Sequence, residues 1–223
     1  MTEPPSKAQW PSYMPLPRED IFALGVISLN YCHLENMFRL LFSSVARWND
    51  FQTAAVFHRL ANNIRMDVIS ELLTKTTIPV ETKKLIEHFV TGFRLCADAR
   101  NLIMHSSSGG LHRSDRAVGL VLERHSKTGN KLVCYLTLDD LRRVADDIHR
   151  YMTFGAYVVT EVKNYVTHLQ DDHAEDFRSL PPTLRERPPL PIPLSWRSPD
   201  DPKVLNIPPV ASHLLSPYRI RDA

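Results

Sequence analysis

The chain has 223 residues, of which 43% are hydrophobic and only seven are glycine, a composition that fits one globular domain and favours helix. A net charge of only +2 argues against the strongly basic class of nucleic-acid-binding proteins. The three cysteines, Cys32, Cys96 and Cys134, lie far apart in apolar stretches, which argues against a disulfide framework and for buried thiols in a reducing compartment.

The sequence carries no pattern typical of export or of membrane insertion. Its first residues, MTEPPSKAQWPSYMPLP, lack a basic segment followed by an apolar one. No apolar run approaches the roughly 18 residues that a membrane-spanning helix needs. We therefore expect a cytoplasmic protein that does not cross a membrane.

Prolines divide the chain into three parts. Five of the 17 prolines fall within residues 1–17 and eleven follow residue 180, whereas only Pro79 lies between these groups. Proline at such density prevents helix and central strand and favours an extended polyproline II conformation. We therefore expect a proline-rich segment at 1–17, a helical domain at 18–172 and an extended tail at 173–223, which would pack on the body or on a partner.

Four stretches of the domain have the three- and four-residue apolar spacing of amphipathic helices. They run from about 18 to 46, from about 50 to 75, from about 80 to 105, and onward from Thr137. The apolar stripe predicted for the second helix consists of Phe57, Leu60, Ile64, Val68 and Leu72. Four long helices with short connections favour an all-α fold, an antiparallel four-helix bundle.

Two β-rich runs lie between the third and fourth helices, in AVGLVLERHSKTGNKLVCYLTL. The Thr-Gly-Asn sequence between them is a turn signal, so the pattern predicts a β-hairpin at about 116–137. We expect this hairpin to project from one end of the bundle.

Arg100 stands where the third helix should be apolar. It continues the stripe of Phe89 and Phe93, and an unpaired guanidinium on that face would cost several kcal/mol, so it needs a partner or an open cavity. Glu35 lies on an inward-leaning face of the first helix and is one candidate partner. The alternative is a local pair between Glu35 and Arg39, four residues later.

His105 follows Arg100 by five residues, which is about 140° around an ideal helix, so the two side chains do not share a face. They can meet one phosphate only if the arginine extends towards the helix end and the helix stops near His105. The run SSSGG at 106–110 supplies such an ending and predicts a connector that borders a cleft.

The run Arg-Asn-Leu-Ile-Met-His at 100–105 resembles the signature of the HEPN family (higher eukaryotes and prokaryotes nucleotide-binding). The resemblance covers about residues 18–170 and includes the helical bundle and the aromatic-rich, glutamate-bearing stretch LNYCHLENMFRLLF. It implies metal-independent cleavage of RNA. His105 would be the general acid or base, Arg100 would clamp the phosphate, Asn101 would orient the phosphate or the histidine, and Glu35 would support the site.

The resemblance further implies attack by the ribose 2′-OH, products that end in a 2′,3′-cyclic phosphate, and no requirement for a metal or another cofactor. Members commonly form homodimers that place two motifs across one cleft. Some are toxins or act in antiphage defence, which implies an antitoxin or another protein as partner. Ser107 stands where a subgroup of the toxins has a tyrosine that its antitoxin modifies, so regulation by that route is not implied.

Two other functions fit the same residues. Many HEPN members are inactive, so one alternative is a catalytically silent module that binds a nucleotide, RNA or a partner protein. The other is a purely structural helical protein in which Arg100 pairs with Glu35.

Three residues after the third helix are further candidates for contact with RNA: Ser106, His112 and Arg113. The alternative for the last two is that they are solvated polar groups. The stretch HLQDDH at 168–173 gathers histidine and aspartate, but it lacks the spacing of known metal sites. A solvated helix end is therefore the favoured interpretation there, and we expect no metal.

Overall fold

The structure, a computed structural model, describes residues 18–114, 117–125, 127–168 and 186–196. Within these ranges the helices are α1 (Arg18–Ala46), α2 (Asp50–Phe57), α3 (Asn62–Lys75), α4 (Val80–His105) and α5 (Leu138–His168), and the strands are β1 (Ser107–Ser114), β2 (Ala117–His125) and β3 (Lys131–Thr137). The chain is therefore mostly helical, as its composition predicts. The segment 1–17 and most of the tail from 173 onward lie outside the described residues.

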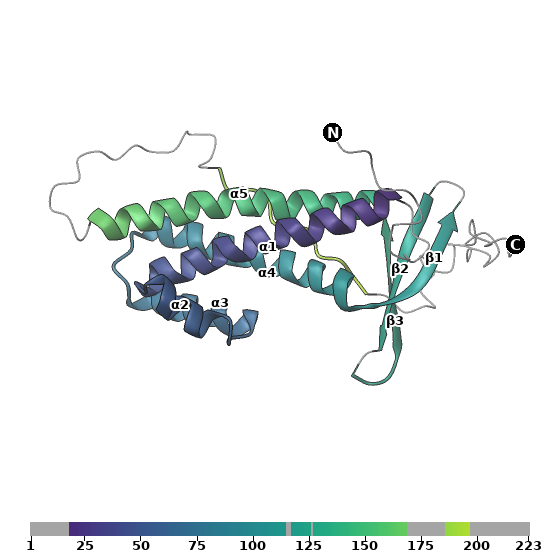
Figure 1. Ribbon diagram of the computed structural model, residues 1–223, viewed down its shortest axis with the longest axis horizontal. Coiled ribbons are helices and arrows are strands. Elements are labelled where there is room, and N and C mark those ends of the chain that lie inside the picture. Colours follow the sequence, from purple (N-terminus) through teal and green to yellow (C-terminus); the bar gives the residue numbers. More distant parts are fainter. Residues whose placement is uncertain (1–17, 115–116, 126, 169–185, 197–223) are drawn as a thin grey trace, which may run out of the picture.

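Three long helices form the core of the molecule. In Figure 1, α1 and α5 run side by side in the same direction and α4 runs the opposite way, while the short helices α2 and α3 lie against the C-terminal half of α1. The core consists mainly of large aromatic and aliphatic side chains from these elements, with Phe38, Phe89, Phe93 and Tyr151 fully buried. The arrangement differs from the predicted bundle of four long antiparallel helices.

The second predicted helix accounts for much of this difference, because the structure divides it into two. The helix α2 ends at Phe57 and α3 starts at Asn62. The backbone carbonyl of Phe57 accepts a turn hydrogen bond of 3.3 Å from the N–H of Leu60 and a second one of 2.8 Å from Nε of Arg65. The break also rotates α3, so that its buried residues are Arg65, Ile69 and Leu73, and the predicted stripe through Ile64, Val68 and Leu72 is wrong by one position.

A reciprocal pair of glycines lets α4 and α5 approach each other closely. A Cβ atom on Gly92 of α4 would overlap the ring of Tyr151 of α5. A Cβ atom on Gly155 of α5 would overlap the ring of Phe89 of α4. Each glycine therefore makes the space that an aromatic ring from the other helix fills.

The strands form a three-stranded antiparallel sheet in the order β1-β2-β3, at the end of the molecule where α4 stops and α5 starts. Residues 107–110 therefore belong to β1, and the connector predicted there is wrong. On the described strands, Leu122, Cys134 and Leu136 pack with the helical core, while Val121 and Val133 form a small cluster of their own.

The start of α5 is set by a capping box directly after β3. The hydroxyl of Thr137 accepts a hydrogen bond of 3.1 Å from the backbone N–H of Asp140, and the Asp140 carboxylate accepts one of 3.0 Å from the backbone N–H of Thr137. This exchange satisfies backbone donors that the first turn of a helix otherwise leaves unpaired.

The substitution Gly92→Ala tests the contact between α4 and α5. The added methyl group must displace the fully buried ring of Tyr151, so we expect a loss of about 1–3 kcal/mol in the free energy of unfolding, measured by urea denaturation. Gly25→Ala is the matched control, because a Cβ atom there meets nothing within 4 Å and alanine favours helix by up to about 1 kcal/mol. Equal stability of the two variants would contradict the proposed close contact.

Candidate functional site

Arg100, Asn101 and His105 lie together at the C-terminal end of α4. The helix ends at His105, and Ser106 takes the extended conformation that leads into β1. The Arg100 side chain reaches towards this end, where its Nη1 lies 3.0 Å from Asn101 Oδ1 and 3.0 Å from His105 Nε2. Because a guanidinium only donates hydrogen bonds, His105 Nε2 must act as the acceptor in this contact.

The guanidinium of Arg100 is held between the helix end and an aromatic ring. Its Cζ atom lies 5.2 Å from the centre of the Tyr31 ring, within range of a cation–π interaction. Its Nε atom is buried and has no hydrogen-bond partner among the described residues. A buried donor without an acceptor costs about 1–3 kcal/mol, and such groups in native structures often have a functional role.

Glu35 pairs with neither of the residues that the sequence suggested. Its Oε1 accepts a hydrogen bond of 2.9 Å from Nη1 of Arg65 on α3. Arg39 instead contacts Asp50, at 3.4 Å. The predicted pairs of Glu35 with Arg100 and with Arg39 are therefore both wrong, because the break before α3 brings the guanidinium of Arg65 to α1.

Arg65 is a buried charge that the sequence analysis missed. Besides Glu35, it donates a hydrogen bond of 2.8 Å to Asn62 Oδ1, and its Cζ atom lies 3.9 Å from the centre of the Phe57 ring. One signal in the sequence could have revealed it. Arg65 precedes Ile69 by four residues on an apolar stripe, which is the same pattern that singled out Arg100.

Tyr31 connects the two arginines. Its hydroxyl oxygen accepts a hydrogen bond of 3.0 Å from Asn62, which itself is bound to Arg65, and its ring lies beneath Arg100. Burial, together with the nearby Glu35 carboxylate, raises the pKa of Tyr31 to about 12 against the opposing effects of Asn62 and the two guanidinium groups. The phenol is therefore neutral at all ordinary pH values.

A cleft of about 690 Å³ borders His105 on another side. Its floor comes from the last turns of α4, including Asn101 and His105, and continues into Ser106. Glu123 and His125 of β2 form a second side. The third side comes from residues 193, 194 and 196 of the proline-rich tail, which bring Trp196 into the cleft.

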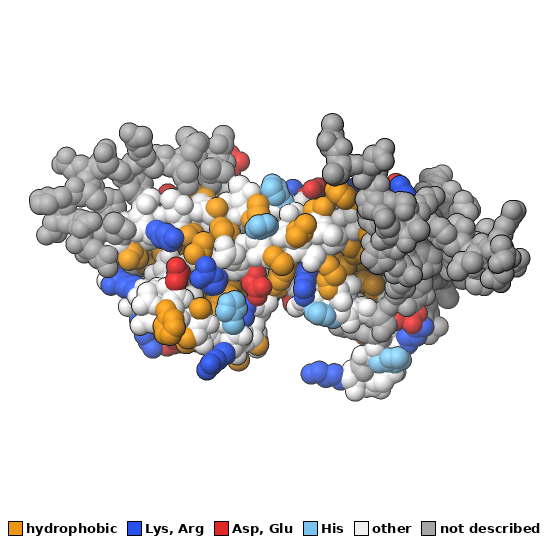
Figure 2. Space-filling view, viewed as in Figure 1, with side chains coloured by type: hydrophobic (Ala, Val, Ile, Leu, Met, Phe, Trp, Pro, Cys, Tyr) orange, Lys and Arg blue, Asp and Glu red, His pale blue; other side chains and the backbone are white. Residues whose placement is uncertain are grey.

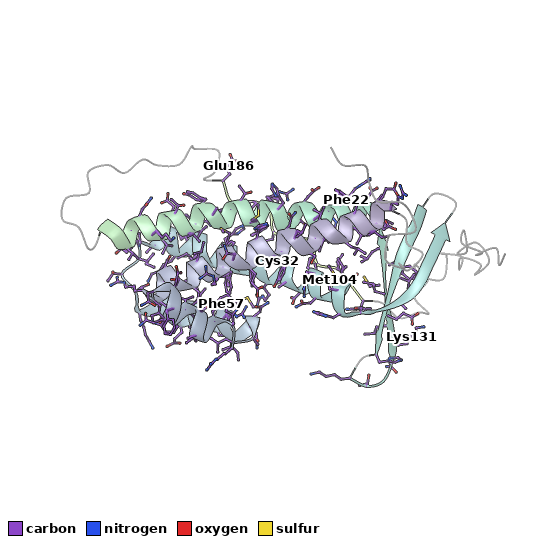
Figure 3. All side chains as sticks on the ribbon, in the orientation of Figure 1. Phe22, Cys32, Phe57, Met104, Lys131 and Glu186 are labelled. Carbon is purple, nitrogen blue, oxygen red and sulfur yellow. The ribbon has the colours of Figure 1, made fainter. Side chains whose placement is uncertain are left out.

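The residues 186–196, called the strap below, run along α4 and α5 towards this cleft. In Figure 1 the strap is the yellow-green trace that passes from α5 to the base of the sheet, and Figure 3 labels Glu186 at its start and Met104 near the end of α4. Pro188, Pro191 and Leu194 are its less exposed residues before Trp196, at intervals of three. Three residues per turn is the period of polyproline II, as predicted for the tail.

Side chains of both helices hold the strap by its backbone carbonyls. The carbonyl oxygen of Pro188 lies 2.8 Å from Nε2 of His88 and 3.4 Å from the hydroxyl of Tyr151. The carbonyl oxygen of Ile192 accepts a hydrogen bond of 3.1 Å from Nη1 of Arg143. Of the two predicted places for the tail, on the body or on a partner, this part of it therefore packs on the body.

The structure does not describe the side chains of the remaining predicted site residues. His112 and Arg113 belong to β1, but their side chains lie outside the described residues, as does most of the 168–173 cluster. Within the described ranges, no three histidine, cysteine or acidic side chains are grouped so that they could hold a metal ion. No helix of the described part combines the length and the apolar character that crossing a bilayer demands.

In comparisons with protein-family models, curated proteins and solved structures, nothing matches this chain.

The substitution Arg65→Ala tests the network beneath Arg100. It removes the ion pair with Glu35, two hydrogen bonds and a cation–π contact, so we expect a loss of about 2–4 kcal/mol in the free energy of unfolding. Arg39→Ala removes the exposed pair with Asp50 and should cost less than about 1 kcal/mol. Similar unfolding midpoints in urea for the two variants would count against a structural role of Arg65.

The raised pKa of Tyr31 predicts a loss of stability in alkali. Above the ordinary tyrosine pKa of about 10, the unfolded chain releases this proton while the folded chain keeps it until about pH 12, so stability falls as the pH rises between these values. Compared with wild type, Tyr31→Phe should lose about 1.4 kcal/mol less between pH 8 and pH 11. Urea denaturation at both pH values measures this, and parallel losses in the two proteins would refute it.

Proposed function

We propose that the protein is a metal-independent endoribonuclease of the HEPN type, which cleaves RNA through attack of a ribose 2′-OH on the adjoining phosphate. The observation that carries this proposal is the contact of 3.0 Å between Arg100 and His105 at the exposed end of α4. A phosphate clamp and a proton-transferring imidazole are the groups that this reaction needs, and the attacking oxygen comes from the RNA itself.

In the proposed reaction, an entering phosphate replaces His105 as the partner of Arg100 Nη1, which frees Nε2 of His105. The imidazole then takes the proton of the 2′-OH as this oxygen bonds to phosphorus, or gives a proton to the departing 5′-oxygen. Arg100 stabilises the charge that grows on the phosphate oxygens, and Asn101, which contacts Arg100, orients the phosphate or the histidine. The products carry a 2′,3′-cyclic phosphate and a 5′-hydroxyl.

Two further observations support a ligand at this place. The buried Nε of Arg100 has no acceptor among the described residues, although Tyr31 fixes the guanidinium there. A cleft of about 690 Å³ adjoins His105, within the range of about 300–1,000 Å³ that small-molecule sites occupy. Figure 2 shows basic, acidic and apolar side chains interspersed on one face, so we attribute attraction of RNA to the site and not to a broad basic surface.

We further propose that the protein is a cytoplasmic homodimer that acts as a toxin or in antiphage defence. Its partner would be an antitoxin or another protein. A dimer would supply one His105 as base and the other as acid. It is supported by the outward-facing apolar residues Phe22 and Leu29, seven positions apart on α1 and therefore on one face, with exposed fractions of 74% and 66%.

The substitution His105→Ala tests the nuclease. Purified wild-type protein should cleave total RNA in the presence of EDTA, and loss of the acid–base group should slow cleavage about 10²- to 10⁴-fold. His149→Ala is the matched control, since this exposed histidine follows Arg143 on α5 and lies outside the site; it should cleave like wild type. Gel electrophoresis gives the rates, and growth arrest on expression gives a second readout.

Cleavage that EDTA abolishes, or that persists in His105→Ala, would refute the proposal. Binding of RNA or a nucleotide without cleavage would favour the inactive module instead, with Arg100 as the phosphate-binding group.

A further inference from the structure

The cleft beside His105 has two sides of different chemistry. One side is the strap, which contributes the apolar side chains of Leu194 and Trp196. The other is β2, which contributes Glu123 and His125, while Asp98 and Leu102 lie four residues apart on the α4 floor. The Glu123 carboxylate is partly neutralised by Lys131, whose Nζ lies 2.7 Å away.

These sides favour a nucleobase and disfavour a phosphate. Carboxylates repel phosphate oxygens, but they accept hydrogen bonds from the amino groups on the edges of bases. An aromatic side chain offers a face on which a base can stack. Arg100 is the cationic group suited to a phosphate, and it is not among the residues that line the cleft. It contacts the Tyr31 ring and His105 beside the cleft. His105 therefore lies between Arg100, where a phosphate would bind, and the cleft, where a base would bind.

The strap lines this cleft without filling it. His88 and Tyr151 hold its start and Arg143 holds its middle, which fixes the chain leading to Trp196. With the strap in place, about 690 Å³ of the cleft remains open. Without the strap, the cleft would lose the apolar side chains of Leu194 and Trp196, which face α4 and β2.

We propose that Trp196 is a specificity-determining residue, on which an unpaired base of the RNA stacks while the adjoining phosphate lies at Arg100 and His105. This inference rests on the proposed function and adds a base-binding residue to it. Bases in a duplex are stacked on each other and cannot enter the cleft, so the substrate is single-stranded RNA or an unpaired loop.

Binding of a short single-stranded RNA to the full chain tests the proposal. Every ribose of this probe carries a 2′-O-methyl group, which removes the attacking hydroxyl, and fluorescence anisotropy gives the dissociation constant. Trp196→Leu keeps apolar packing on the strap but lacks a ring, so we expect binding weaker by about 5- to 150-fold. Trp196→Phe keeps a ring and should retain most of the affinity.

Trp48→Ala is the matched control, because Trp48 packs on Phe42 just beyond the end of α1 that is remote from the sheet. It should bind the probe like wild type. A second series replaces single bases of the probe by abasic sites. One abasic position should weaken binding by wild type and cause no further loss in Trp196→Leu, because the missing ring and the missing base belong to one contact.

The outcomes separate this inference from the nuclease proposal. If Trp196→Leu binds as tightly as Trp48→Ala, the base site is wrong, even where wild type cleaves RNA. If binding depends on Trp196 but wild type does not cleave, the base site stands and the nuclease proposal falls. Absence of any binding by wild type overturns the base site, whatever the cleavage assay gives.

Discussion

The contact between the Arg100 guanidinium and the ring of Tyr31 is the constraint on which the candidate site depends. A charged group on the core-facing stripe of α4 is tolerated only if something replaces the water that it loses. The ring, at 5.2 Å, supplies part of that replacement and leaves Nη1 directed at Asn101 and His105. The same contact explains why the arginine reaches the helix end instead of turning to solvent.

The position of Tyr31 depends in turn on a second buried arginine. Asn62 binds the phenolic oxygen, Arg65 binds Asn62, and Glu35 balances the charge of Arg65. Loss of Arg65 would therefore disturb the surface against which Arg100 rests, although no atom of Arg65 is bonded to Arg100 in the described hydrogen-bond network. Stability and site geometry are coupled here through one aromatic side chain.

The cleft is assembled from parts that are distant in the chain. The helix α4 supplies His105, β2 supplies Glu123, and the strap supplies Trp196, some 90 residues after the histidine in the sequence. The strap reaches this place because its three-residue period presents Pro188, Pro191 and Leu194 to the helices. A proline-rich segment outside the helices thus packs on the helical core and lines the cleft.

The local features can be predicted from the amino-acid sequence: a mostly helical chain, the ends of α1 and α4, an arginine on an apolar stripe, and a histidine at a helix end. These follow from spacing and from residue chemistry within a few turns of one helix. The predicted partners of Glu35 and the predicted buried face of α3 are wrong, because both depend on how the break after Phe57 rotates one helix against another. Arg65, in contrast, has a signal in the sequence, its four-residue spacing from Ile69. Which distant groups pair with a buried charge depends on how the helices pack, since the pairing of residues far apart in the chain leaves no periodic trace in the sequence.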